Sequence, residues 1–411
     1  MLKGIFTGLF WCSVFSLQAV TIRVAPGTPV ANIQEAIRMA APYDIISITP
    51  GIYFEHNIII DRPLTIKGTG GAIIDAENKG EIFTIQANHV TIEGMELRHT
   101  GYSSLNELAG IKLLSSRYCV LNNNTTMDCC FGIYLSNCSN CVVKNNTIRS
   151  VAVNEQRSGN GIHLWKCDSN TIQSNTITGH RDGIYFEFVT HCGVYKNVSK
   201  NNLRYGIHFM FSNNDEYAEN IFSHNGAGVA VMFSKNVTIK NNTFEFSEGG
   251  AAYGILLKEI TDSRMEGNTF NKNSVAIYME GSNRFDIIHN IISNNGWACR
   301  VQASCYDVKL HENNFMGNSF DIATNGSLMM NNFDGNYWDK YEGYDLNKDK
   351  VGDIPYNAVS LYSMIVERTP YALILYRSFL VSILDRTEKA IPTITPAQLK
   401  DNRPAMQPFS L

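Results

Sequence analysis

The amino-acid sequence predicts an all-β protein, a single right-handed parallel β-helix of the pectin-lyase-like solenoid type. Two observations carry this prediction. A short apolar strand that begins with glycine, once with alanine, recurs eight times, and an asparagine follows 14 residues after the start of every copy. The copies succeed one another at intervals of 22 to 29 residues, which suits one turn of a solenoid. Each turn would pair its strands with those of the next turn.

The repeat also predicts which side chains face the core. The strands begin at Gly110, Gly132, Gly161, Gly183, Gly206, Gly228, Gly254 and Ala276, and the asparagines are Asn124, Asn146, Asn175, Asn197, Asn220, Asn242, Asn268 and Asn290. Side chains alternate between the two faces of a strand. The expected core residues therefore include Ile162, Leu164, Ile184, Phe186, Ile207 and Phe209. The asparagines would lie at one corner in the left-handed conformation and hydrogen-bond the next turn; glycosylation of the N-x-T sequences is the alternative.

Residues 1–19 have the pattern of a secretory signal peptide. Lys3 supplies a positive charge, Ile5–Leu17 form an apolar stretch, and Ala19 is a small residue suited to a cleavage site. A short buried helix is the alternative interpretation. A cleaved signal peptide would export the mature chain.

The β-helix is expected to span residues 20–335 and to begin with a helical cap. Thr28-Pro29 predicts the start of a helix that carries Ile33 and Ile37 on one face, over the open end of the core. The first short strands are then expected at residues 44–48, 57–60, 64–66, 82–85 and 90–92.

Residues 336–358 form an acidic segment with calcium-like spacing. Oxygen donors recur at alternate positions, namely the side chains of Asp345, Asn347, Asp349 and Asp353 and the carbonyl of Val351. Lys350 stands where an EF-hand needs glycine, and Tyr356 where it needs an acidic residue. A full EF-hand is therefore excluded, and the segment predicts a smaller calcium-binding turn, with a solvated acidic turn as the alternative.

Residues 359–390 predict a helical segment and residues 391–411 a proline-rich extended tail. Thr369-Pro370 is a helix start, and the pattern from Tyr371 to Lys389 is apolar and helical, but its Arg377 and Asp385 are too polar for a membrane span. The segment would cap the far end of the solenoid or dock on a membrane partner. The apolar residues expected to dock are Tyr371, Leu375, Phe379 and Leu380.

Strand alternation also identifies the residues that face outward from the central turns. Stacking would bring one patch together from His163, Trp165, Tyr185, Glu187, His208, Met210 and Met232. Aromatic, imidazole and thioether groups favour a binding surface over a plain solvated one. Further polar residues are expected at the same edge, namely His180, Arg181, Asp182 and Arg204.

The soft donors within this patch predict a copper(I) site. His208 and Met210 lie two residues apart on one strand, and Met232 lies one turn further along the axis. Imidazole with thioethers is a donor set that suits Cu(I), and His163 is a weaker candidate for the same metal. The alternative is that the methionines pack beneath a loop.

Composition and cysteine content limit the remaining functions. The 411 residues carry 34 Lys+Arg and 38 Asp+Glu, a formal net charge of −4, which argues against nucleic acid as a partner. Removal of the predicted signal peptide would leave nine of the 10 cysteines. Most of them follow the repeat, so stacked core thiols are expected, with disulfides between turns, or between Cys299 and Cys305, as the alternative.

Three consecutive turns resemble the NosD family closely. The segments are GNGIHLWKCDSN (Gly159–Asn170), GHRDGIYFEFVT (Gly179–Thr190) and NLRYGIHFMFSNN (Asn202–Asn214), and NYWDKYEGYDLNKDKVGDIPY (Asn336–Tyr356) is similar as well. NosD proteins are β-helices of the carbohydrate-binding and sugar-hydrolase type that assist the maturation of nitrous oxide reductase in the periplasm.

The resemblance implies a non-enzymatic component of an ABC-transporter complex that assists copper delivery. The implied partners are the permease NosY, the ATPase NosF, the copper chaperone NosL and the apo reductase NosZ, with membrane association through the permease. It adds weight to transient copper contact at His208, Met210 and Met232, and it brings no catalytic motif.

A carbohydrate-active β-helix enzyme, such as a polysaccharide lyase, epimerase or hydrolase, is the alternative function. The acidic residues of the patch, Asp182 and Glu187, would then supply the carboxyl groups. Five residues of extended strand would separate them by about 16 Å, further than paired catalytic carboxyls usually lie. A purely structural solenoid would present uniformly polar outer columns, which the patch contradicts.

Overall fold

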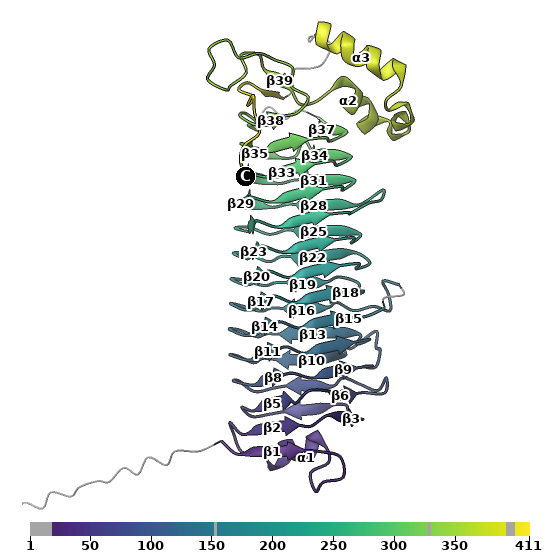
Figure 1. Ribbon diagram of the computed structural model, residues 1–411, viewed down its shortest axis with the longest axis vertical. Helices are drawn as coiled ribbons and strands as arrows, with labels where there is room; N and C mark the ends of the chain where they lie inside the picture. Colours follow the sequence, from purple (N-terminus) through teal and green to yellow (C-terminus); the bar gives the residue numbers. More distant parts are fainter. Residues whose placement is uncertain (1–18, 152–153, 327–329, 392–398) are drawn as a thin grey trace, which may run out of the picture.

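The computed structural model describes residues 19–151, 154–326, 330–391 and 399–411. These residues wind into an elongated stack of turns whose strands form three long parallel sheets, named A, B and C below (Figure 1). Of the predicted signal peptide, residues 1–18 lie outside the described residues. The fold class predicted from the sequence is confirmed.

Two of the three sheets contain 13 strands each. Sheet A consists of β1 (Thr21–Val24), β2 (Ile45–Ile48), β5 (Thr65–Gly68), β8 (Thr91–Glu93), β11 (Val120–Asn122), β14 (Val142–Lys144), β17 (Thr171–Gln173), β20 (Gly193–Tyr195), β23 (Glu216–Ala218), β26 (Thr238–Lys240), β29 (Thr261–Glu266), β32 (Asn283–Ile288) and β35 (Tyr306–His311). Sheet B consists of β3 (Gly51–Tyr53), β6 (Ala72–Asp75), β9 (Glu96–Arg98), β12 (Thr125–Met127), β15 (Thr147–Arg149), β18 (Thr176–Thr178), β21 (Val198–Lys200), β24 (Ile221–Ser223), β27 (Thr243–Glu245), β30 (Thr269–Asn271), β33 (Ile291–Ser293), β36 (Asn314–Met316) and β38 (Tyr337–Trp338).

Sheet C has 12 strands and contains all eight strands of the glycine repeat. It consists of β4 (Ile58–Ile60), β7 (Phe83–Ile85), β10 (Ala109–Leu114), β13 (Phe131–Ser136), β16 (Ile162–Trp165), β19 (Ile184–Glu187), β22 (Tyr205–Met210), β25 (Ala227–Met232), β28 (Tyr253–Lys258), β31 (Val275–Glu280), β34 (Trp297–Val301) and β37 (Phe320–Ala323). The strands pair in the register that the repeat predicts, with Ile162 beside Ile184 and Ile184 beside Ile207.

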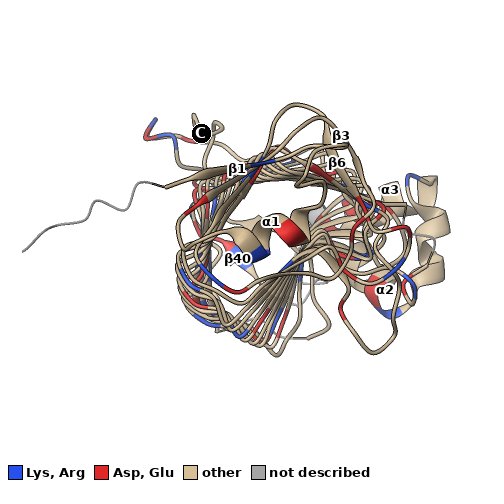
Figure 2. Cartoon of the chain, turned by 90° about the horizontal axis from the view of Figure 1, so that it is seen from below, with Lys and Arg blue, Asp and Glu red and all other residues tan. Residues whose placement is uncertain are grey.

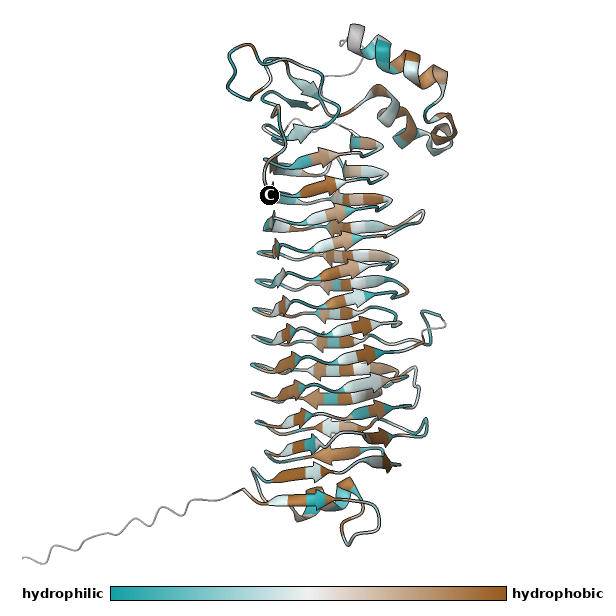
Figure 3. Cartoon of the chain, in the orientation of Figure 1, coloured by the Kyte–Doolittle hydropathy of each residue, from teal (hydrophilic) through white to brown (hydrophobic). Residues whose placement is uncertain are grey.

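The core fills the inside of the stack with apolar side chains from every turn. All six core residues predicted from strand alternation are fully buried, and their apolar neighbours along the axis continue the same columns (Figure 3). At about 25 cal/mol per Å² of buried apolar surface, this continuous column of branched and aromatic side chains is the main stabilising contribution.

The repeated asparagines form a buried hydrogen-bonded ladder along one corner. Asn197 is typical: its Oδ1 accepts the backbone N–H of Asn175, and its Nδ2 donates to the carbonyl of Ile172 and to Oδ1 of Asn220. The predicted left-handed conformation belongs instead to the residue before each ladder position, such as Lys196 with φ 55°. The preceding residue makes the turn, which leaves the asparagine side chain directed inward.

A second buried ladder lies five residues further along each of the later turns. Its asparagines repeat the same contacts, as where Oδ1 of Asn295 accepts the backbone N–H of Asn273. Its members in successive turns are His180, Asn202, Asn225, Ser247, Asn273, Asn295 and Asn318. This second series can be recognised in the sequence only after the turns have been aligned by the first series, because a histidine and a serine replace two of its asparagines.

The N-terminal helix α1 (Ile33–Met39) covers the open end of the first turn (Figure 2). Its Ile33 and Ile37 are buried, as the sequence predicts, but the helix begins later than Thr28-Pro29. The side chain of Asn32 accepts the backbone N–H of Glu35 and caps the helix. The Thr28 hydroxyl instead donates to the carbonyls of Ala25 and Val30, and residues 26–29 form a turn and a bend before the helix.

The far end of the stack is closed by the C-terminal segments. The last sheet strand is β38, three residues beyond the predicted boundary at 335. A two-stranded antiparallel pair then joins β39 (Tyr356–Asn357) to β40 (Lys400–Asp401). The buried carboxylate of Asp401 accepts the backbone N–H groups of Gly335 and Asn336, so it terminates the asparagine ladder.

The predicted single C-terminal helix is interrupted. The structure has α2 (Leu361–Arg368), the 3₁₀ helix η1 (Pro370–Leu375) and α3 (Phe379–Ala390). Arg377 adopts φ 63° between η1 and α3, which a continuous α-helix does not permit. Helices α2 and α3 pack on Phe320 of β37 through Tyr362, Val366 and Val381, beyond the last turns of sheet C (Figure 1).

The proline-rich tail lies against the solenoid where it is described. Ala405 pairs with Tyr337, and the backbone N–H of Phe409 donates to Oδ1 of Asn314. Residues 392–398 of the predicted tail lie outside the described residues. The β-helix of the same chain supplies the surface on which the described part of the tail packs.

Candidate functional site

The outer patch lies on four consecutive strands of sheet C: β16, β19, β22 and β25. Parallel pairing places His163 beside Tyr185 and Tyr185 beside His208. The second column contains Trp165, Glu187, Met210 and Met232 in register. The structure therefore brings together the residues that the sequence assigned to this patch, because in-register stacking converts a sequence repeat into a spatial column.

The three expected copper donors are neighbours on this patch. His208 and Met210 are alternate residues of β22, and Met232 is the pairing partner of Met210 on β25. His208 is only 5% exposed, and the two methionines are half-buried. The Tyr185 hydroxyl donates to Sδ of Met210 over 3.8 Å. Among the described residues no group of three or more His, Cys, Asp or Glu side chains could hold a metal ion, so a site here would depend on the methionine sulfurs.

Aromatic rings continue the first column on both sides of His208. The ring centroids of His163 and Tyr185 lie 4.8 Å apart, those of Tyr185 and His208 4.9 Å, and those of Tyr205 and His208 4.8 Å. Burial and the nearby Arg181 guanidinium lower the pKa of His163 to about 3, so this imidazole is neutral at pH 7. Burial, with the Glu187 carboxylate, raises the pKa of Tyr185 to about 12.

A buried carboxylate lies behind the patch. Asp182 is fully buried, and its oxygens lie 3.7 Å from Nε of Arg181, 3.7 Å from Nε of Arg204 and 3.8 Å from Nδ1 of His208. Neither oxygen has a hydrogen-bond partner, and neither ring nitrogen of His208 has one. Buried polar groups without partners are rare in folded proteins and mark places where a ligand or water completes the site.

His180 does not belong to this surface. It was expected at the same edge as Arg181, but its side chain points inward, at a position of the second ladder, and is 1% exposed. Burial lowers its pKa to about 4, which keeps the ring neutral. The corner turns between His180 and Asp182, and the alternation of an extended strand therefore does not apply across these residues. Asp182 is likewise buried beneath the patch, and its carboxylate is not available to a large substrate.

Asn160 is a member of the site that the sequence did not reveal. Its buried side chain accepts from Nη2 of Arg181 at 3.1 Å and contacts Nδ1 of His163 at 3.0 Å. It precedes Gly161 as Asp182 precedes Gly183, so both occupy one column behind the two histidines. A comparison of the residues before each repeat glycine could have found it.

The acidic loop is folded on its own backbone. The Asp345 carboxylate accepts the N–H groups of Asp349 and Lys350, the Asp349 carboxylate accepts that of Val351, and Asp353 accepts that of Leu346. Asn347 donates from its side chain to Asp349. Calcium binding by this loop stays a prediction.

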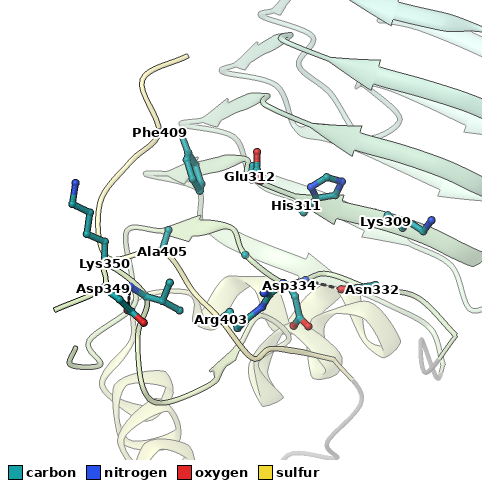
Figure 4. Close-up of a pocket in the computed structure, with 12 residues that line it drawn as sticks. Lys309, His311, Glu312, Asn332, Asp334, Asp349, Lys350, Arg403, Ala405 and Phe409 are labelled. Carbon is teal, nitrogen blue, oxygen red and sulfur yellow. Dashed lines mark hydrogen bonds between the residues drawn. The ribbon is translucent and has the colours of Figure 1, made fainter. Parts of the chain in front are cut away.

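This loop and the tail border an open cleft of about 520 Å³ at the end of sheet A (Figure 4). Its walls mix both signs of charge. They include Lys309, His311, Glu312, Asn332, Asp334, Asp349, Lys350, Arg403 and Phe409. The cleft lies near the C-terminal end of the solenoid, away from the outer patch of the central turns, and the copper donors do not line it.

The residues expected to dock on a membrane partner lie on an exposed apolar surface. Tyr371 is 90% exposed and Phe379 is 80% exposed, while Leu375 and Leu380 are also exposed. Ile374 and Ile383 extend the same surface. Among the described helices, none is long and apolar enough to cross a membrane.

The cysteines are stacked thiols rather than cross-links within the described residues. All nine cysteines from Cys119 to Cys305 are free, and only Cys130 among them is not fully buried. Burial raises the pKa of Cys129 to about 12, which makes such thiols unreactive at neutral pH.

The fold defines a parallel β-helix protein, with a patch of aromatic, imidazole and thioether side chains on one sheet. Residues 44–166 match the right-handed β-helix family. The catalytic unit of an α-1,3-glucanase from Streptomyces thermodiastaticus has the same fold, with a TM-score of 0.59, 14% identity, and coverage of 79% of this chain and 69% of that chain. At this identity the likeness shows the fold alone.

The closer similarity is to NosD. Residues 149–343, which include the whole outer patch, match the family described as periplasmic copper-binding protein (NosD). A probable ABC transporter binding protein NosD from Pseudomonas aeruginosa is 27% identical, over 85% of this chain and 86% of its own. Its counterpart from Stutzerimonas stutzeri is 26% identical over 96% of this chain and 97% of its own. The predicted resemblance to NosD is confirmed over most of the chain.

Proposed function

We propose that this chain is a non-enzymatic periplasmic component of an ABC-transporter system that binds copper(I) transiently during assembly of the nitrous oxide reductase copper centre. The observation that carries the proposal is the placement of His208, Met210 and Met232 together on the outer patch. Imidazole and thioether donors favour Cu(I) over harder cations. The NosD relatives, named as ABC transporter binding proteins, support the transporter association.

The site supplies binding rather than chemistry in this proposal. A transient carrier needs donors that a partner can reach, and the two methionines are half-buried rather than enclosed. The partners would be the chaperone NosL as copper donor, NosZ as acceptor, and NosY with NosF as the transporter. The exposed apolar residues of η1 and α3, including Tyr371 and Phe379, would contact the permease.

Copper binding is tested by titrating the full mature chain with Cu(I) against a chromophoric chelator. The variant His208→Ala/Met210→Ala should bind at least about tenfold more weakly than the wild type. The matched control is His311→Ala/Met316→Ala, which removes the same residue types from the far end of the solenoid. Equal affinity of all three proteins would contradict the proposed copper site.

Transporter association is tested by recovering the tagged chain from detergent-solubilised membranes. The wild type should co-purify with a permease and an ATPase, and Phe379→Ser/Leu380→Ser should lose both. Phe54→Ser/Leu105→Ser is the matched control, because these apolar residues are equally exposed in other turns. Loss of the partners in the control, or their retention in the α3 variant, would contradict docking through α3.

A further inference from the structure

The two histidines of the outer patch face chemically different groups behind them. Nδ1 of His163 faces the Asn160 amide at 3.0 Å, whereas Nδ1 of His208 faces the Asp182 carboxylate at 3.8 Å. Asn160 and Asp182 are both fully buried, so neither interaction competes with bulk water. A neutral imidazole has one N–H donor and one lone-pair acceptor, and the group that faces one nitrogen decides which role it takes.

Arg181 fixes the orientation of the Asn160 amide. A guanidinium can only donate hydrogen bonds, so the Asn160 atom that lies 3.1 Å from Nη2 of Arg181 must be the oxygen. The amide nitrogen therefore faces His163 and donates to Nδ1. Nδ1 must then carry the lone pair, and the proton of this imidazole lies on Nε2.

The carboxylate of Asp182 imposes the opposite arrangement on His208. An ionised carboxylate only accepts, so it stabilises a proton on the nearest ring nitrogen, Nδ1. Nε of Arg181 and Nε of Arg204 each lie 3.7 Å from this carboxylate, on opposite oxygens. Neither ring nitrogen of His208 has a hydrogen-bond partner within the described part of the chain, so the charge of the carboxylate 3.8 Å from Nδ1 decides the tautomer and leaves the lone pair on Nε2.

We infer that Asn160 and Asp182 are positioning residues that assign opposite tautomers to His163 and His208. His208 thereby keeps a lone pair on the buried Nε2, the atom through which it would bind a metal, whereas His163 carries a proton on its Nε2. The consequence for metal binding rests on the proposed copper function, but the tautomers themselves do not. Arg181 connects the two arrangements because it contacts both Asn160 and Asp182.

The tautomers can be read directly by long-range ¹⁵N–¹H correlation spectra of the metal-free mature chain labelled with ¹⁵N-histidine. Signals are assigned with the single variants His163→Gln and His208→Gln. We expect the proton on Nε2 in His163 and on Nδ1 in His208. The same tautomer in both rings, or rapid averaging of both forms in either ring, would overturn the inference.

Two nearly isosteric substitutions test whether Asn160 and Asp182 determine the tautomers of the two histidines. Asn160→Asp replaces the donor behind His163 by an acceptor and should move its proton to Nδ1. Asp182→Asn should abolish the Nδ1 preference of His208 and weaken Cu(I) binding by about tenfold, as for other residues that orient a metal ligand. Circular dichroism and the thermal midpoint check folding, and if Asp182→Asn does not fold, Asn160→Asp still decides the question through the His163 signal.

The outcomes for copper and for the tautomers are separable. If the wild type shows both expected tautomers but does not bind Cu(I), the proposed function fails and the tautomer assignment stands. If the wild type binds Cu(I) and folded Asp182→Asn binds it equally well, the positioning role of Asp182 is wrong. An unchanged His163 spectrum in folded Asn160→Asp would equally refute the role of Asn160.

Discussion

Two rows of buried polar side chains pass through the same turns, and they differ in how their hydrogen bonds are used. In the asparagine ladder, Asn197 accepts and donates to its neighbours in both directions along the axis. At the outer patch, His208 and the Asp182 carboxylate behind it are also buried but have no hydrogen-bond partner among the described residues. The ladder uses its polarity to join one turn to the next, whereas Asp182 and His208 form no such hydrogen bond.

We expect the largest loss of stability from a substitution that interrupts the asparagine ladder. Asn197→Ala removes four side-chain hydrogen bonds, including the one that Oδ1 accepts from the buried backbone N–H of Asn175. We expect the free energy of unfolding to fall by about 3–5 kcal/mol. The measurement is urea unfolding followed by circular dichroism.

Asn122→Ala is the matched control for this substitution. Asn122 accepts one hydrogen bond, from Asn145 at the exposed surface, so its loss should lower the free energy of unfolding by less than about 1 kcal/mol. Similar losses in the two variants would remove the distinction between buried ladder asparagines and the remaining asparagines.

The buried carboxyl group of Asp215 has a hydrogen-bond partner on only one oxygen, and it should make the free energy of unfolding depend on pH. Asp215 is buried, its Oδ1 accepts the backbone N–H of Cys192, and its Oδ2 has no partner. Burial raises its pKa to about 8, whereas an unfolded aspartate titrates near 4. The native state therefore retains a proton that the unfolded state releases, and this contribution to stability is lost as the pH rises from about 4 to 8.

Asp215→Asn should abolish this pH dependence. Asn170 lies at the same position two turns earlier and shows that an amide fits there, donating to the carbonyl of Cys138. The stability of the variant relative to the wild type should increase with pH by up to about 1.4 kcal/mol per pH unit. Urea unfolding at several pH values measures it, and a difference that is constant with pH would disprove the assignment.

The sequence predicts the architecture well because the repeat encodes it. The constant distance from Gly161 to Asn175, and from Gly183 to Asn197, defines the register, and in-register pairing then defines the columns of the patch. Predictions fail where the chain leaves extended strands. The left-handed residue precedes each ladder asparagine, and Arg377 divides the predicted C-terminal helix, because these conformations depend on packing at corners and ends.

The same limit applies to the candidate site. Strand alternation is sufficient to place His208 and Met210 on one face. It cannot show that Asp182 is buried behind them, or that Arg181 orients Asn160, because the corner before each glycine rotates the side chains out of the alternating pattern. The buried polar groups behind the outer patch can therefore be identified only from the three-dimensional structure.

We expect the smallest change in stability from a substitution of His208. It therefore gives the clearest contrast between the outer patch and the asparagine ladder. His208→Leu removes an imidazole that makes no hydrogen bond and replaces it with an apolar side chain at a position that is 5% exposed. The gain from apolar burial and the loss of the Asp182 contact are both small, so the free energy of unfolding should change by less than about 1 kcal/mol. Cu(I) affinity should nevertheless fall by at least about tenfold in the same protein. A loss of stability comparable to that of Asn197→Ala, measured in the same urea series, would mean that His208 supports the fold as the ladder does, and the difference between the two rows would disappear.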